Sequence, residues 1–195
     1  MIRGRPLEYD PDTVLDAAMQ LFWQQGYEAT SLQDLLHVMR LSKSSLYQAY
    51  GSKHNLFLHC IKRYHKRTMD EMHERLNGAD SGAQFVLETL SKVISEANEL
   101  ANPKGCLMTN TASEFAQSNS QVALQVAIGL DGYREMFRQA VEKGQQDETI
   151  RPDMDSNQLA NYLVTNMSGL RTMVKAGTDK TTLQQTVGVI ISAIQ

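Results

Sequence analysis

The segment TSLQDLL at residues 30–36, followed by LSKSSLYQAY at residues 41–50, predicts two short helices joined by a tight turn. The first segment begins with two hydroxyl side chains, each followed three positions later by an amide or a carboxylate, which is the pattern of a capping box at a helix start. The second begins with small hydroxyls and one cation, side chains that can reach bases and phosphates when a helix enters the major groove of DNA. Together the two segments predict a helix-turn-helix DNA-binding module.

Charge is divided along the chain in the direction that DNA binding requires. The first 68 residues contain nine Lys and Arg against six Asp and Glu, whereas residues 69–195 contain ten against sixteen, and the whole chain carries a net charge of -3. The basic excess therefore lies with the predicted DNA-binding module, and the acidic remainder is repelled by the phosphate backbone.

The composition is that of a globular protein. With 195 residues, 42% of them hydrophobic, the chain can form one sizeable core or two small ones. No run approaches the ~18 apolar residues that a membrane span requires, and the N-terminus lacks the apolar core of a secretory signal. Cys60 and Cys106 show no metal-ligand spacing. We therefore expect a cytoplasmic protein in a reducing compartment, without a membrane segment, a metal or another cofactor.

Helix signals follow one another along the chain, and strand signals are scarce. Thr30 or Ser31 caps one predicted helix, and apolar spacing and caps predict the others at about residues 11–25, 43–49, 53–77, 106–116, 120–144, 155–175 and 181–195, with one more containing residues 85–94. The sequence thus predicts an all-α fold of about nine helices. We expect a module at residues 1–52 and a helical domain at residues 53–195, with the helix at 53–77 as the connector.

The last predicted helix carries branched aliphatic residues at helical spacing. These are Leu183, Val187, Ile190, Ile191 and Ile194. Exposed on a monomer they would form a costly apolar patch, and pairing with the same helix of a second copy would bury it. The pattern predicts a symmetric homodimer. The alternative is that these residues pack inside the protomer.

Residues 8–60 resemble the TetR family of transcriptional regulators. The resemblance is carried by Ala17, Ala18, Leu21, Phe22, Gly26, Tyr27, Thr30, Ser31 and Leu35, by the run at residues 41–47, and by Tyr50, Ser52, Lys53, Leu56 and Phe57. Tyr50 stands where the family usually has Phe, and Met39 and Arg40 replace small residues. The resemblance implies a three-helix DNA-binding domain followed by a helical ligand-binding and dimerisation domain. It further implies a repressor that binds a palindromic operator in double-stranded DNA.

The candidate DNA contacts lie at the start of the second helix of the motif and around it. Lys43, Ser44 and Ser45 open that helix, and Gln48 can pair bidentately with adenine. Tyr47 and Lys53 resemble the family positions that hold phosphates, and Thr30 or Ser31 offers a helix N-terminus to another phosphate. The alternative for all of these positions is a solvated helical face.

A basic arm precedes the module. Arg3 and Arg5 flank Gly4 in the sequence RGRP, which matches the core of an AT-hook and suits a narrow A·T-rich minor groove. The alternative is a disordered basic tail that adds only nonspecific attraction to DNA.

Cys106 is the candidate for a thiol switch. It follows Pro103, Lys104 and Gly105 and starts a predicted helix, where the helix dipole and a nearby ammonium favour a thiolate. An electrophile or oxidant could then be the signal. The segment at 105–108 is similar to one branch of the family, and that similarity adds Lys175 as a partner. The alternative is an inert residue in a pocket wall, and for Cys60 the core is the expected place.

A bound small molecule is the other possible signal, and its pocket is expected among the helices from 106 to 175. The candidate lining residues are Met108, Asn110, Thr111, Glu114, Phe115, Tyr133, Phe137, Tyr162, Asn166, Met167, Leu170 and Arg171. Glu114 and Arg171 could hold a charged ligand or pair with each other.

Two other functional classes compete with a sensor. An all-α enzyme is disfavoured, because the chain has no His-Glu-x-x-His, no Glu-x-x-His and no glycine-rich phosphate loop. If the protein bound DNA without responding to any effector, its large second domain would have no function. The sequence therefore favours an effector-responsive regulator that is not an enzyme.

Overall fold

The structure is a computed structural model that describes residues 10–99, 104–115 and 119–195. Within these residues the chain forms helices only, which confirms the all-α fold. The bounds are α1 Pro11–Gln25, α2 Leu32–Met39, α3 Lys43–Tyr50, α4 Lys53–Gly78, α5 Gly82–Glu99, α6 Leu107–Phe115, α7 Ser120–Gln146, α8 Ser156–Lys175 and α9 Lys180–Ile194.

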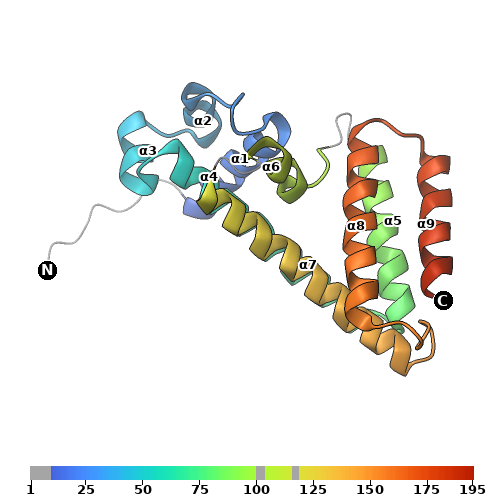
Figure 1. Cartoon of the computed structure of the whole chain (residues 1–195). Helices are drawn as coiled ribbons and strands as arrows, with labels where there is room; N and C mark the ends of the chain where they lie inside the picture. Colours follow the sequence, from blue (N-terminus) through green and yellow to red (C-terminus); the bar gives the residue numbers. More distant parts are fainter. Residues whose placement is uncertain (1–9, 100–103, 116–118) are drawn as a thin grey trace, which may run out of the picture.

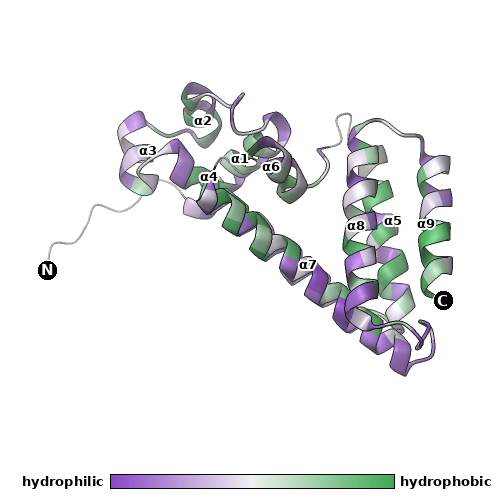
Figure 2. Ribbon diagram, in the orientation of Figure 1, coloured by the Kyte–Doolittle hydropathy of each residue, from purple (hydrophilic) through white to green (hydrophobic). Residues whose placement is uncertain are grey.

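The helices form two groups joined by two long helices (Figure 1). At one end lie α1, α2 and α3, and α6 packs on α7 and α4 near this end; at the other end α5, α8 and α9 lie side by side. The long helix α7 spans the distance between the two groups and packs along α4. Figure 2 shows hydrophilic residues along α3 and hydrophobic residues concentrated on α5 and on the C-terminal half of α9.

Local signals position α1, α2 and α3. The Asp10 side chain caps α1, and Ser31 and Asp34 form a reciprocal capping box at the start of α2. Arg40 ends α2 in the left-handed region at φ 52°, and Ser42 caps α3 two residues later. The apolar sides of these helices meet the start of α4 in a shared core formed by Val14, Ala18, Phe22, Leu35, Met39, Leu46, Leu56 and Phe57.

The packing of α5 on α7 depends on a glycine. A Cβ added to Gly82 would overlap the Ala140 carbonyl oxygen and the Gly144 backbone. The Gly82 N–H also donates to the Asp147 carboxylate at 2.9 Å, and Ala83 N–H donates to the Thr149 hydroxyl at 3.2 Å. The start of α5 is therefore held directly against the backbone of α7.

The apolar stripe of α9 lies inside the protomer, which corrects the reasoning behind the predicted dimer. Leu183, Val187, Ile190 and Ile194 are buried where α9 packs on α5 and α8, and Ile191 is half-buried. The four buried residues leave almost no surface for a second copy, because their own chain already covers them. The opposite side of the helix exposes Val189 at 68%.

No helix in the described part of the chain is both long enough and apolar enough to cross a membrane.

Candidate functional site

The exposed face of α3 is the first candidate functional surface. Lys43, Ser44, Tyr47 and Gln48 are exposed, whereas Leu46 on the opposite side is fully buried in the core. Leu46 anchors the helix, so the four exposed side chains are available to a groove of DNA.

Serine hydroxyls hold the N-terminal turn of α3. The Ser42 hydroxyl accepts from the Ser45 N–H at 3.1 Å and lies 2.9 Å from the Ser44 hydroxyl and 2.8 Å from that of Ser45. Ser45 is half-buried. This hydroxyl cluster next to Lys43 places donors at the positive end of a helix, which suits a phosphate.

The two residues before α2 differ in what they can contact. Ser31 is exposed and caps α2, so its hydroxyl, which bonds with Asp34, lies at the surface. Thr30 is fully buried, and its hydroxyl donates to the Gly26 carbonyl at 2.6 Å. A direct contact of Thr30 with DNA, which the sequence predicted, does not fit this burial. Arg3 and Arg5 lie outside the described residues.

Lys53 sits on an aromatic ring in the first turn of α4. Its ammonium lies 4.2 Å from the centroid of the Tyr27 ring, at the distance of a cation–π contact. Tyr27 in turn packs against Phe57 and Phe115, with ring centroids 5.0 and 5.1 Å away. The cation is thereby held at the edge of the module, beside the turn between α1 and α2.

Glu114 on α6 binds the backbone of the module. Its carboxylate accepts from the N–H groups of Tyr27 at 2.9 Å and Glu28 at 2.7 Å. The sequence assigned this residue to an effector pocket, with a possible ion pair to Arg171. The structure instead places it at the turn that follows α1, where it links α6 to the DNA-binding end of the chain.

Two further contacts join α1 to the segment before α6. The Trp23 indole N–H donates to the Gly105 carbonyl at 3.1 Å, and the Lys104 ammonium donates to the Gln20 side chain at 2.6 Å. Burial lowers the pKa of Lys104. Together with the bonds of Glu114, these bonds form a set that we call the α1–α6 contacts, which joins residues 104–114 to α1 and to the turn that follows it.

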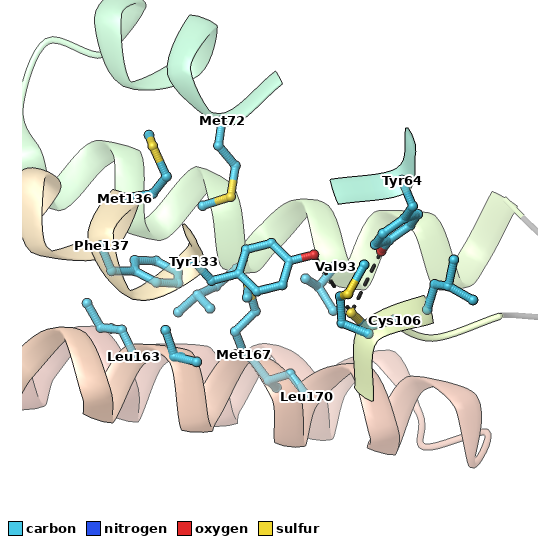
Figure 3. Close-up of a cluster of buried hydrophobic side chains, with 14 of the residues drawn as sticks. Tyr64, Met72, Val93, Cys106, Tyr133, Met136, Phe137, Leu163, Met167 and Leu170 are labelled. Atoms are coloured by element: carbon cyan, nitrogen blue, oxygen red, sulfur yellow. Dashed lines mark hydrogen bonds between the residues drawn. The ribbon is translucent and has the colours of Figure 1, made fainter. Parts of the chain in front are cut away.

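Cys106 lies at the inner end of this segment, in contact with two tyrosines (Figure 3). It is 1% exposed, the Tyr64 hydroxyl donates to its sulfur at 3.7 Å, and the Tyr133 hydroxyl is 3.9 Å away. Burial is the main cause that raises the pKa of both phenols, so both hydroxyls remain protonated at neutral pH.

Lys175 lies near this cluster, whereas Cys60 lies in the core between α1 and α4. The exposed Lys175 side chain passes beside Gly105, the residue before Cys106, since a Cβ on that glycine would lie 3.4 Å from the Lys175 Cδ. Cys60 is fully buried in the core of α1 and α4, and burial raises the pKa of its thiol.

A cavity of about 230 Å³ opens beside the tyrosines. It is bounded by five helices through Met19, Gln20, Trp23, Tyr64, Arg67, Thr68, Glu71, Met72, Arg75, Thr89, Lys92, Tyr133, Met167 and Arg171. Trp23 and Tyr64 meet edge to face across its apolar part, with ring centroids 5.0 Å apart. The cavity thus lies between α1 of the DNA-binding module and the C-terminal helices.

Of the residues expected to bind an effector, the cavity brings together Tyr133, Met167 and Arg171. The residues of that set that do not line it are Cys106, Met108, Asn110, Thr111, Glu114, Phe115, Phe137, Tyr162, Asn166, Leu170 and Lys175. Phe137 is fully buried core, Asn110 donates to the Lys104 carbonyl, and Asn166 donates to the Tyr162 carbonyl.

Sequence reasoning missed the lining residues on α1, α4 and α5. A signal for those on α4 was present, because Tyr64, Thr68, Met72 and Arg75 recur every three or four residues and mix aromatic, hydroxyl and cationic side chains on one side of a helix. The described residues contain no group of His, Cys, Asp and Glu that could hold a metal ion.

The chain is similar to known families and to curated proteins along most of its length. Residues 14–60 match the family described as bacterial regulatory proteins, tetR family, and residues 82–190 match the tetracyclin repressor-like C-terminal domain. The uncharacterized HTH-type transcriptional regulator YezE of Bacillus subtilis (strain 168) is 29% identical over 192 residues, which cover 98% of this chain and 99% of that protein. The HTH-type transcriptional repressor ComR of Escherichia coli (strain K12) is 28% identical over 190 residues, covering 97% and 90%.

Solved structures of similar regulators have the same fold. A cysteine mutant of the TetR family transcriptional regulator CifR, complexed with 26-bp double-strand operator DNA, superposes with a TM-score of 0.84 at 28% identity, over 98% of this chain and 100% of that one. The reduced form of E. coli NemR has the same fold, with a TM-score of 0.87 at 18% identity over 94% and 96% of the two chains.

Proposed function

The chain belongs to the TetR family and is a DNA-binding transcriptional regulator rather than an enzyme, and from this premise we propose that it is an effector-released repressor. Its partner is an approximately palindromic operator in double-stranded DNA. The observation that carries the proposal is the exposed face of α3, where Lys43, Ser44, Tyr47 and Gln48 are presented by a helix anchored through Leu46. The related CifR was solved on operator DNA, and the related ComR is named a repressor.

We divide the chain into a DNA-binding module at residues 1–52 and an effector and dimerisation domain at residues 53–195. In this division α4 is the connector, and a homodimer presents two α3 helices to half-sites one helical turn or a multiple of it apart. The exposed sides of α8 and α9 supply the dimer face. They include Met173 and Val189, and Gly169 and Gly188 leave space there for a close approach of helices.

The α1–α6 contacts explain how a signal would release DNA. A change at the cavity or at Cys106 displaces residues 104–114, and the bonds of Trp23 and Glu114 carry that displacement to the module. A shift of a few ångströms is enough to spoil simultaneous occupancy of both half-sites, because their spacing on DNA is fixed.

Operator binding tests the repressor proposal. Fluorescence anisotropy with DNA from beside the protein's own coding region should show saturable binding at least ~1000-fold tighter than to random DNA of the same length. Equal affinity for both DNAs at physiological salt would contradict the proposal of a specific operator in that region.

A Cys106→Ser variant tests whether the thiol is a switch. Hydrogen peroxide would transfer one oxygen to the Cys106 sulfur to give a sulfenic acid, with water as the second product. The added oxygen would replace the contacts of the Tyr64 and Tyr133 hydroxyls with the sulfur and would displace residues 104–114 relative to α1. We expect operator affinity to fall about tenfold or more on oxidation of the wild type and to stay constant in the variant.

Cys60→Ser is the matched control, because that buried thiol donates to the Leu15 carbonyl of α1 and makes no bond to either tyrosine. Its operator affinity should fall on oxidation as in the wild type. If oxidation leaves wild-type affinity unchanged, the signal acts through the cavity instead of the thiol.

Glu114→Gln tests the link between α6 and the module. The amide has one acceptor oxygen in place of two and no charge, so the N–H groups of Tyr27 and Glu28 lose charge-assisted bonds. We expect these two amides to exchange hydrogen about threefold to tenfold faster, measured by mass spectrometry of peptides that cover residues 26–31.

The matched control is Glu74→Gln, which neutralises an exposed carboxylate on α4 away from the module. It should leave the exchange of residues 26–31 unchanged. Equal exchange in Glu114→Gln and the wild type would show that the carboxylate does not hold this turn.

A further inference from the structure

The residues that line the cavity indicate the chemical class of its ligand. Its apolar part is formed by Met19 and Trp23 of α1, Tyr64 and Met72 of α4, and Met167 of α8. These side chains can enclose a ring or a short aliphatic body, because aromatic and methionine side chains adapt closely to apolar ligands. A molecule seated there would touch α1 and α8 together.

The charges that line the cavity are mostly positive. The cations are Arg67, Arg75, Lys92 and Arg171, and the one acidic lining residue is Glu71. Lys92 pairs with Glu71 at 3.0 Å, and Arg67 lies 3.7 Å from Asp16, which is outside the lining. Since cations outnumber acids four to one in the lining, the cavity attracts an anion.

Arg75 and Thr89 make the most specific polar pair in the cavity. The half-buried Arg75 guanidinium donates to the Thr89 hydroxyl at 3.2 Å, and Thr89 is only 4% exposed. Among the described residues Arg75 has no carboxylate within 4.0 Å. A guanidinium that is partly withdrawn from water and bonded to a neutral hydroxyl has free donors in the planar arrangement that a carboxylate accepts.

We propose that this cavity binds a small organic carboxylate, with the carboxyl group on Arg75 and Thr89 and the apolar body toward Trp23 and Tyr64. The volume of about 230 Å³ corresponds to roughly eight water molecules at ~30 Å³ each, so the ligand has about that many non-hydrogen atoms or a few more. A monocyclic aromatic acid or a short fatty acid has this size. The assignment rests on the proposed function, since it names the effector class of the same regulator.

The single tryptophan of the chain supplies the measurement. Because Trp23 is the one Trp in the sequence and lines the cavity, its fluorescence reports occupancy of the cavity directly. The probes are benzoate, phenylacetate and hexanoate, each compared with its neutral primary amide of nearly the same shape. We expect at least one acid to give a saturable change, and its amide to bind about tenfold or more weakly, the size of one lost charge-assisted hydrogen bond.

Arg75→Gln removes the proposed carboxylate ligand, and Lys66→Gln removes an exposed cation of α4 that does not line the cavity. The affinity of the acid should fall about tenfold or more in Arg75→Gln and stay within twofold in Lys66→Gln. The affinity of the amide should be the same in all three proteins, which also shows that the variants are folded.

Three results would overturn the assignment. These are no saturable binding of any acid, equal binding of acids and amides, or wild-type affinity for the acid in Arg75→Gln. Operator binding without any ligand is measured on the same samples. If that binding is intact while the acids fail, the ligand class is wrong and the repressor proposal stands, whereas absent operator binding counts against the repressor proposal alone.

Discussion

Gly82→Ala is expected to destabilise the protein by about 3 kcal/mol or more and to lower its melting temperature by roughly 6–12 °C. The added methyl group would overlap the Ala140 carbonyl oxygen and the Gly144 backbone on α7. Backbone atoms of a helix cannot move aside as a flexible side chain can, so α5 and α7 must separate. Their separation also breaks the bond from the Gly82 N–H to Asp147. Urea unfolding followed by circular dichroism measures the loss.

Gly78→Ala is the matched control, because the same methyl group would meet no atom within 4 Å at the end of α4. It should leave the free energy of unfolding unchanged or raise it by a few tenths of a kcal/mol, as Ala favours the helix. Equal stability of the two variants would mean that α5 and α7 do not pack as closely as the structure shows.

Helix positions were predictable from the sequence because their signals are local. The helix predicted at residues 11–25 is found as Pro11–Gln25, with Asp10 as its cap and Gly26 at its end. The long helix predicted at residues 53–77 is found as Lys53–Gly78. Caps, glycines and apolar spacing act within one or two turns of the chain, so a sequence contains nearly all of that information.

What covers an apolar helix face could not be predicted in the same way. The spacing of Leu183, Val187, Ile190 and Ile194 correctly indicated a buried face on the last helix. It did not indicate whether α5 and α8 of the same chain or a second copy would bury that face, because both give the same pattern.

The sequence predicted only some of the residues that line the cavity, for a related reason. Five helices far apart in sequence bound it, and side chains such as Trp23 and Thr89 become neighbours only when the fold forms. Glu114 shows the same limit, since its partners are the backbone N–H groups of Tyr27 and Glu28, more than eighty residues earlier. Backbone donors carry no sequence signal at all.

Substitutions on α3 and at the start of α4 should have the largest effect on DNA binding. In a homodimer each substitution acts at both half-sites. Tyr47→Phe removes one proposed hydrogen bond to phosphate per protomer, and a bond to a charged group contributes about 1.5–3 kcal/mol. We expect Tyr47→Phe to weaken operator binding roughly 100-fold or more, with a similar factor for random DNA, because phosphates carry no sequence information.

Lys53→Ala should have the same nonspecific character and a further signature in salt. If each Lys53 neutralises one phosphate, the dimer loses two, and the slope of log affinity against log salt should fall by roughly 1.8. The variant also removes the ammonium from the Tyr27 ring. Lys53→Arg keeps both the charge and the contact with the ring, so it should retain most of the wild-type slope.

Gln48→Ala should instead change sequence preference, because an amide that pairs with adenine discriminates between bases by about 1–3 kcal/mol per contact. The three substitutions therefore separate in one experiment, in which each variant is titrated with the operator, with operators altered at single positions, and with random DNA at several salt concentrations. Gln48→Ala should lose discrimination at one position of each half-site and keep the wild-type salt slope. If Tyr47→Phe or Lys53→Ala altered preference while Gln48→Ala weakened all sequences equally, α3 would lie in the groove with a different face inward, and the roles of these side chains would be exchanged.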